Sequence, residues 1–175
     1  NFMNIKSYIA DIIGFPSDGI IFRDISPLIG NYEALNYVLD SFEKYALSLD
    51  FDCIAAIDAR GFIFGSPLAN RLKVPFVPIR KSGKLPPPVK SIKYDLEYGN
   101  SRLECKDDVF NSTKKVILVD DLLATGGTVN AAIELVSNSG AIVVSVLLVA
   151  ELLYLNGRNN LPNNIDINCL VSYEK

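Results

Sequence analysis

Residues 116–132, VILVDDLLATGGTVNAA, say more about the possible folds of this chain than any other stretch. Val116 to Val119 form a continuous apolar run, which is typical of a strand buried on both faces. Asp120 and Asp121 then fall at the C-terminal edge of that strand. A loop of small residues follows, and apolar residues at helical spacing predict a helix from about Gly127. The segment therefore predicts a strand, an acidic edge, a tight loop and a helix.

The tight loop, Ala124 to Thr128, is typical of an anion site. Free amides at a helix N-terminus, together with glycine amides, suit a phosphate. We expect Thr125 or Thr128 to cap the helix. Carboxylates beside such a loop suit sugar hydroxyls or a hard cation such as Mg2+. The stretch thus favours a phosphorylated sugar with a metal, although a Thr-Gly turn taken alone is also common scaffolding.

Short apolar runs alternate with helical patterns along the rest of the chain. This alternation predicts an α/β fold with a mostly parallel twisted sheet flanked by helices. Helices are expected at 3–13, 31–49 and 61–72, and strands at 53–58, 74–80, 116–119, 141–150 and 165–174. Residues 14–30 read as irregular, 81–93 as a polar loop, and 93–99 with 101–105 as a hairpin.

Composition limits the classes of protein that remain. With 175 residues, 49% of them hydrophobic, the chain suits one domain, 1–175. A net charge of -3 and a pI near 5.0 argue against nucleic acid. The apolar runs are too short for a membrane span, and three widely spaced cysteines without a signal pattern favour the cytoplasm. Because there is no histidine, a general acid or base must be another side chain or the substrate.

Two further segments carry candidate ligand groups. In IDARGFIFG, residues 57–65, Arg60 follows a buried strand and could grip pyrophosphate with two hydrogen bonds. The alternative is a structural pair between Arg60 and Asp58. In GIIFRDISPL, residues 19–28, an aromatic face at Phe22 and donors at Arg23 could hold a flat base. The alternative there is a core phenylalanine and a surface arginine.

Two polar segments have plainer alternatives. IRKSGKLPPP, residues 79–88, places Arg80, Lys81 and Lys84 around a glycine, as many solvated loops do. YDLEYG, residues 94–99, places Glu97 beside Tyr98, where ordinary hairpin residues are equally expected.

All five motifs occur together, and in this order they resemble those of the adenine phosphoribosyltransferases, within the type I phosphoribosyltransferase family. The carrying segments are GFPSDGIIFRDISPL, IDARGFIFG, PIRKSGKLP, YDLEYG and VILVDDLLATGGT. The likeness runs from about Ile5 to about Tyr173. It implies the type I fold, with a small hood subdomain from about 1–30 and a flexible loop and hairpin at about 81–105.

The resemblance also implies an activity. This is purine salvage, in which phosphoribose passes from phosphoribosyl pyrophosphate to adenine and gives AMP and pyrophosphate, in a homodimer with Mg2+ held mainly through the substrate. Transfer to another purine, or a non-catalytic regulator that senses phosphoribosyl pyrophosphate, are the alternatives. The net charge and the lack of a separate basic domain argue against the regulator.

Site residues follow from the resemblance position by position. The implied catalytic residues are Glu97, Arg60 and Tyr98, with Glu97 handling a proton. Those implied for phosphoribosyl pyrophosphate are Asp120, Asp121, Ala124, Thr125, Gly126, Gly127, Thr128, Arg80, Lys81 and Lys84. Those implied for adenine are Ile21, Phe22, Arg23 and Leu122. The one departure from the family is a run of three prolines, Pro86 to Pro88, which stiffens the loop.

Overall fold

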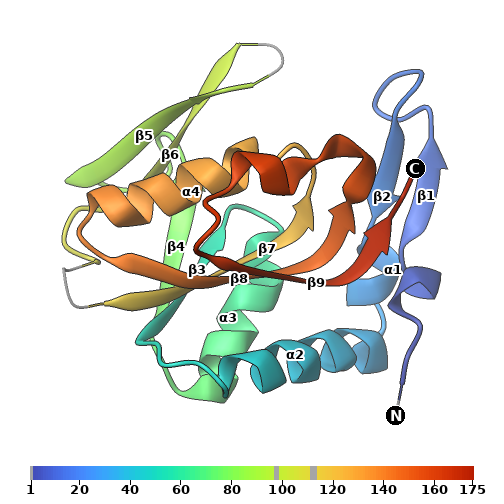
Figure 1. The fold of residues 1–175 in the computed structure, drawn as a ribbon, viewed down its shortest axis with the longest axis horizontal. Helices are drawn as coiled ribbons and strands as arrows, with labels where there is room; N and C mark the ends of the chain where they lie inside the picture. The colour runs from blue at the N-terminus through green and yellow to red at the C-terminus, as the bar shows by residue number, and fades with distance from the viewer. Residues whose placement is uncertain (1, 97–98, 111–113) are drawn as a thin grey trace.

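A computed structural model of the chain describes residues 2–96, 99–110 and 114–175. Its centre is a seven-stranded sheet with the order β5-β6-β4-β3-β7-β8-β9 (Figure 1). The strands are β3 (Cys53–Ile57), β4 (Phe76–Lys81), β5 (Val89–Asp95), β6 (Asn100–Lys106), β7 (Lys115–Leu123), β8 (Ile142–Leu152) and β9 (Asp166–Tyr173). The five strands from β4 to β9 in this order are parallel, and β5 and β6 are antiparallel. The predicted fold class is confirmed.

Helices cover both faces of the sheet, α2 (Tyr32–Ala46) and α3 (Gly61–Leu72) on one side and α4 (Gly127–Asn138) on the other (Figure 1). The two faces follow from the alternation of side chains along each strand. Ile54 of β3 packs in the cluster that contains Phe42 and Phe64, whereas Ala55 packs in the cluster of α4. Apolar residues at every position of β3 therefore fill two cores, as the continuous run predicted.

A small antiparallel sheet lies beside the main one, made of β1 (Ala10–Ile13) and β2 (Ile21–Asp24) (Figure 1). It is flanked by the short helices η1 (Ile5–Tyr8) and α1 (Ser26–Ile29). The helix expected at 3–13 and the irregular stretch expected at 14–30 were therefore wrong in part. Ile13 is 84% exposed, so its apolar pattern does not mark a buried helix face. Antiparallel pairing with β2, across the turn at 14–20, decides this segment.

Two strands are longer than the sequence indicated. β7 continues through both aspartates to Leu123, because its end pairs with β8 at Leu122 and Ala150. The acidic residues thus belong to the ladder instead of following it. β5 begins at Val89, inside the expected loop, because Val89 pairs with Lys106 of β6. The remaining expected helices and strands are confirmed with small shifts at their ends.

Two short helices, η2 (Leu153–Leu155) and η3 (Gly157–Asn160), connect β8 to β9. The three cysteines are free thiols. Within the described ranges, none of the helices has the length and apolar content that a membrane span requires.

Candidate active site

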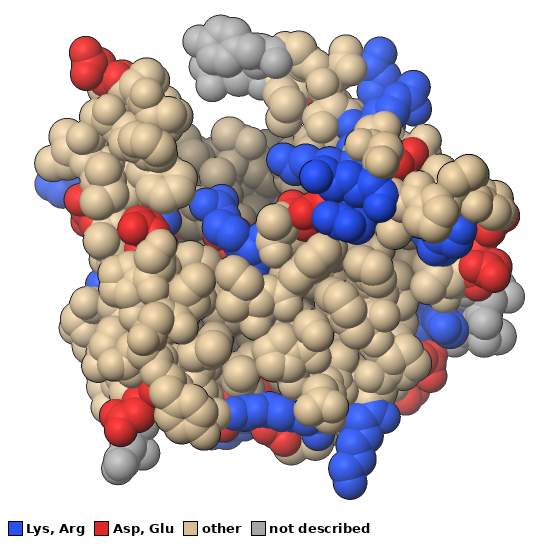
Figure 2. Space-filling model, turned by 180° about the vertical axis from the view of Figure 1, so that it is seen from behind, with Lys and Arg blue, Asp and Glu red and all other residues tan. Residues whose placement is uncertain are grey.

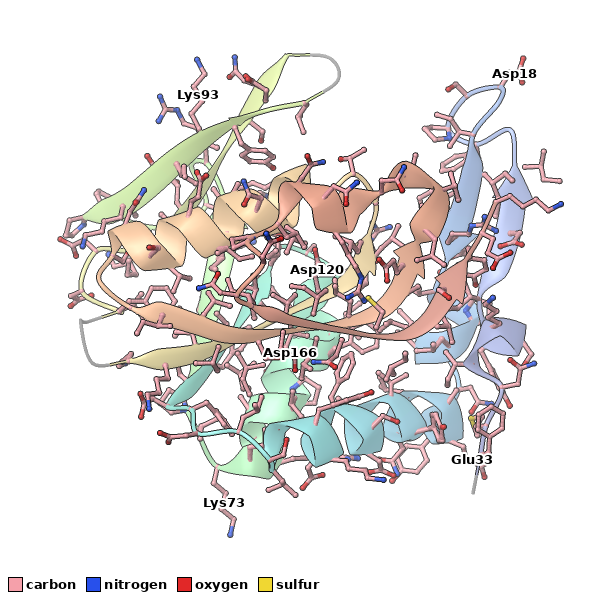
Figure 3. All side chains as sticks on the ribbon, viewed as in Figure 1. Asp18, Glu33, Lys73, Lys93, Asp120 and Asp166 are labelled. Atoms are coloured by element: carbon pink, nitrogen blue, oxygen red, sulfur yellow. The ribbon has the colours of Figure 1, made fainter. Side chains whose placement is uncertain are left out.

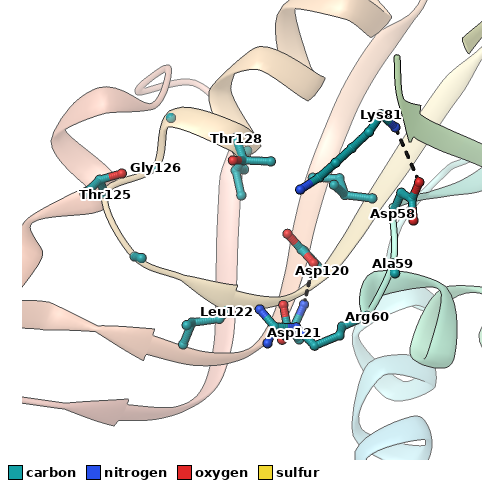
Figure 4. A pocket seen from close by; sticks show the side chains of 14 residues that line it. Asp58, Ala59, Arg60, Lys81, Asp120, Asp121, Leu122, Thr125, Gly126 and Thr128 are labelled. Atoms are coloured by element: carbon teal, nitrogen blue, oxygen red, sulfur yellow. Dashed lines mark hydrogen bonds and ion pairs between the residues drawn. The ribbon is translucent and has the colours of Figure 1, made fainter. Parts of the chain in front are cut away.

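A cavity of about 370 Å³ opens at the C-terminal ends of β3 and β7 (Figure 4). Neighbouring parallel strands bring their carboxyl ends to one edge of the sheet, which is where open α/β sheets bind ligands. The lining comes from the end of β3, Lys81 of β4, the end of β7 and the loop into α4. Lys and Arg side chains border the hollow that is visible from behind (Figure 2). The sequence-predicted phosphate loop and acidic pair therefore share one cavity.

The phosphate loop, residues 124–128, leads into α4 with Gly126 at the N-cap. Gly126 has φ of 88°, a left-handed conformation that glycine adopts without a steric penalty. No described side chain caps this helix end, so the expected capping by Thr125 or Thr128 was wrong. The first residues of α4 line the cavity, and no side chain among the described residues caps their amides, which suits an anionic group.

The two aspartates of β7 have different surroundings. The carboxylate of Asp121 is 7% exposed and lies 2.8 Å from Nε of Arg60. Asp120 lies near the centre of the molecule and accepts a hydrogen bond from the Asp121 amide at 2.8 Å (Figure 3). Burial raises the pKa of Asp120 well above its ordinary value, and the negative charge of Asp121 raises it further. A hydrogen-bond donor placed beside Asp120 would therefore stabilise its ionised carboxylate.

The basic residues expected around the phosphates separate into two groups. Lys81 lines the cavity, and its backbone amide contacts the Asp58 carboxylate (Figure 4). Arg80 pairs with Asp58 at 3.2 Å, so the suggested pair between Arg60 and Asp58 was wrong. Neither Arg80 nor Lys84 lines the cavity within this single chain.

A second cavity of about 580 Å³ lies against the small sheet. Phe22 lines it and makes an edge-to-face contact with Phe15, with ring centroids 5.2 Å apart. Arg60 lines both cavities, and its guanidinium lies 5.7 Å from the centre of the Phe22 ring. A mostly apolar pocket with an aromatic wall therefore adjoins the polar cavity, as a base joined to a phosphorylated sugar requires.

Three of the four residues expected around a base lie elsewhere. Leu122 lines the first cavity, and Ile21 lines neither. The Arg23 side chain is buried and turned away: it pairs with Asp11 at 2.7 Å and donates to the Lys175 carbonyl oxygen at 2.7 Å. Its guanidinium therefore ties the small sheet to the C-terminal residues, and it is not the surface arginine of the alternative either.

Comparisons with known proteins agree with this geometry. Residues 36–170 match the model of the phosphoribosyl transferase domain. An adenine phosphoribosyltransferase of Mycoplasmopsis agalactiae is 48% identical over 172 residues, which cover 98% of this chain and 100% of that protein. The chain belongs to the adenine phosphoribosyltransferase family.

Solved members of the adenine phosphoribosyltransferase family share the fold. The structure from Thermoanaerobacter pseudethanolicus is 46% identical, with a TM-score of 0.92 over 97% of this chain and 98% of that one. The Saccharomyces cerevisiae enzyme, crystallised with D-2,5-dideoxy-2,5-imino-altritol 1,6-bisphosphate and adenine, is 36% identical. Its TM-score is 0.89, over 95% of this chain and 96% of that one.

Two expectations of the adenine phosphoribosyltransferase resemblance cannot be placed. Glu97 and Tyr98 lie outside the described residues, so their expected catalytic roles stay predictions. The helix η3 contacts the phosphate loop, although no sequence motif indicated that it lies beside the site. Its residues, GRNN, have no apolar periodicity, and only the polar run NGRNN after a buried strand could have drawn attention to them.

Proposed function

We propose that this chain transfers phosphoribose from phosphoribosyl pyrophosphate to adenine, giving AMP and pyrophosphate. The observation that carries this proposal is that two adjoining cavities share Arg60. One cavity offers uncapped helix amides and carboxylates, and the other offers an apolar pocket with Phe22 as a wall. The reaction requires a phosphorylated sugar beside a flat base whose faces can pack against apolar side chains.

The residue roles follow from these positions. The amides of residues 124–128 bind the 5'-phosphate, and Asp120 with Asp121 accepts hydrogen bonds from ribose hydroxyls. Phe22 packs against adenine. Ile21 and Arg23 contribute through the backbone of β2, because their side chains do not line the base pocket.

The transition state carries positive charge on the sugar and negative charge on the departing pyrophosphate, so the site needs groups of both signs. As the bond to pyrophosphate breaks, the sugar becomes cationic, and the nearby carboxylates of β7 stabilise it electrostatically. Arg60, whose side chain is 47% exposed, and Lys81 face the departing pyrophosphate. Glu97 takes the proton that adenine loses. Exclusion of water protects the activated sugar from hydrolysis.

Mg2+ fits this site only as a partner of the substrate. Among the described residues no cluster of three or more potential ligands occurs, and the Asp121 carboxylate is engaged by Arg60. Asp120 is therefore the carboxylate that would face the ion, directly or across a water molecule. The substrate would supply most of the oxygen ligands. When bound, the ion neutralises charge on the pyrophosphate.

The functional unit in this proposal is a cytoplasmic homodimer. Arg80 and Lys84 do not line the cavity of their own chain. In a dimer, they would instead contact the phosphates bound in the cavity of the other copy. Symmetric dimers are the commonest assemblies of soluble proteins.

The test measures product formation from phosphoribosyl pyrophosphate and Mg2+ with adenine, hypoxanthine or guanine. We expect AMP from adenine and a kcat/KM for the other purines that is lower by at least about 100-fold, since a polar base edge must match its partners. Comparable turnover of hypoxanthine or guanine would support the other-purine alternative. Binding of phosphoribosyl pyrophosphate without turnover of any purine would support a regulator.

A further inference from the structure

The helix η3 forms the wall behind the phosphate loop. The side-chain amide of Asn160 donates a hydrogen bond to the carbonyl oxygen of Thr125 at 2.7 Å. The two backbones also approach closely, because a Cβ atom on Gly126 would lie 2.5 Å from the carbonyl oxygen of Gly157. A Cβ atom on Gly157 would lie 2.4 Å from the carbonyl oxygen of Ala124. Both positions therefore exclude any side chain, and the two loops pack backbone against backbone.

Arg158 anchors η3 to the sheet. Its Nε atom lies 2.7 and 3.0 Å from the two carboxylate oxygens of Glu151, whose side chain is only 7% exposed. Its Nη1 atom donates to the carbonyl oxygen of Ile167 at 3.1 Å. Leu161, the next residue after η3, is buried in the core that contains α4 residues. The support behind the phosphate loop is thus tied to β8 and β9.

The hydrogen bond from Asn160 has a directional consequence. The carbonyl of Thr125 and the amide of Gly126 belong to one planar peptide group, in which they point in opposite directions. Holding the carbonyl against η3 therefore turns the Gly126 amide away from η3. Gly126 and Gly127 both line the cavity, and two consecutive glycines are costly to order.

We propose that Asn160 is a positioning residue that orders the phosphate loop before the 5'-phosphate binds, carried by η3, which the Arg158–Glu151 ion pair ties to β8. The inference rests on the proposed function, because it assigns the loop to the phosphate of the phosphoribosyl group. It concerns affinity for that phosphate and not the reacting atoms, because Asn160 donates to the carbonyl oxygen of Thr125 and does not line the cavity.

The experiment compares Asn160→Ala with Asn159→Ala, a matched control that removes the adjacent exposed amide. Calorimetry measures binding of ribose 5-phosphate, and steady-state kinetics measures turnover of phosphoribosyl pyrophosphate with adenine. For Asn160→Ala we expect ribose 5-phosphate affinity to fall roughly 3- to 10-fold. This range corresponds to the net free energy of one hydrogen bond. The KM for phosphoribosyl pyrophosphate should rise similarly, with kcat and the KM for adenine within about twofold of the parent.

Two readouts separate positioning from a merely structural role. The NMR order parameters of the Gly126 and Gly127 amides should fall in Asn160→Ala without ligand, while the Tm falls by no more than the loss of one hydrogen bond accounts for. Arg158→Lys keeps the charge but loses the fork of donors, and should shift ribose 5-phosphate affinity in the same direction.

Equal behaviour of Asn160→Ala and Asn159→Ala would overturn the inference. So would a variant whose Tm, kcat and both KM values worsen together, because that pattern reports general loss of structure. If the parent protein neither binds ribose 5-phosphate nor forms AMP, the proposed function itself fails, and the inference fails with it.

Discussion

Asp120 holds a carboxyl group where both burial and a neighbouring charge oppose ionisation. Its pKa is raised in the folded protein, so the folded state retains a proton at pH values where the unfolded chain has lost it. The contribution to stability is present below the unfolded pKa, about 3.9, and is lost as pH rises through the folded pKa. Ionisation of Asp120 is therefore unfavourable to folding.

Asp120→Asn should raise the free energy of unfolding at pH 8. It should also weaken phosphoribosyl pyrophosphate binding by about 1.5–3 kcal/mol, the range for hydrogen bonds to a charged group. Asparagine can still accept the Asp121 amide, so the local geometry is kept. Urea unfolding from pH 4 to pH 8 measures the first effect and calorimetry the second. A stability difference that does not shrink toward pH 4 would contradict the assignment.

At the scale of elements, the small sheet depends on one buried side chain. Arg23 of β2 pairs with Asp11 of β1, stacks on the Tyr173 ring at 4.2 Å and binds the Lys175 carbonyl. Its neighbour Phe22 lines the second cavity, the proposed base pocket. Successive residues of a strand point to opposite faces, so anchoring Arg23 on one face sets the position of Phe22 on the other.

Arg23→Ala should lower the free energy of unfolding by about 1–3 kcal/mol, since it removes buried hydrogen bonds to a charged group. It should also raise the KM for adenine more than the KM for phosphoribosyl pyrophosphate. Lys6→Ala is the control, because Lys6 lies over the same Tyr173 ring but is exposed. Equal changes in the two KM values for Arg23→Ala would show that β2 does not set the base pocket.

For the whole molecule, the position of Lys84 outside its own cavity gives a test of the proposed homodimer. Arg60→Ala and Lys84→Ala, each impaired alone, are mixed, unfolded and refolded together. If Lys84 acts across the dimer, one site of each mixed dimer has both an intact Arg60, from the Lys84→Ala chain, and an intact Lys84, from the Arg60→Ala chain. Random pairing then restores about one quarter of parental activity. No restoration, with mixed dimers verified by mass, would place Lys84 in its own chain's site or outside both.

Local patterns were enough for most of the architecture. The continuous apolar runs at Val116 to Val119 and Cys53 to Ile57 identified buried parallel strands, because both faces of such strands meet helices. The small residues of 124–128 predicted a tight turn before a helix, and Gly126 has φ of 88° at the start of α4. These features depend on neighbours within a few residues, which a sequence displays directly.

Only the tertiary structure decided the partners of the charged groups. The motif IDAR placed Arg60 beside Asp58 in the chain, yet Arg60 pairs with Asp121 of another strand and Asp58 pairs with Arg80. Strand register, set by hydrogen bonding across the sheet, determines which carboxylate each guanidinium can reach. Likewise Arg23 reaches Lys175 near the C-terminus, and Asn160 reaches Thr125, through contacts between segments far apart in sequence. Such contacts leave no local periodicity, and so they become visible only when the chain is folded.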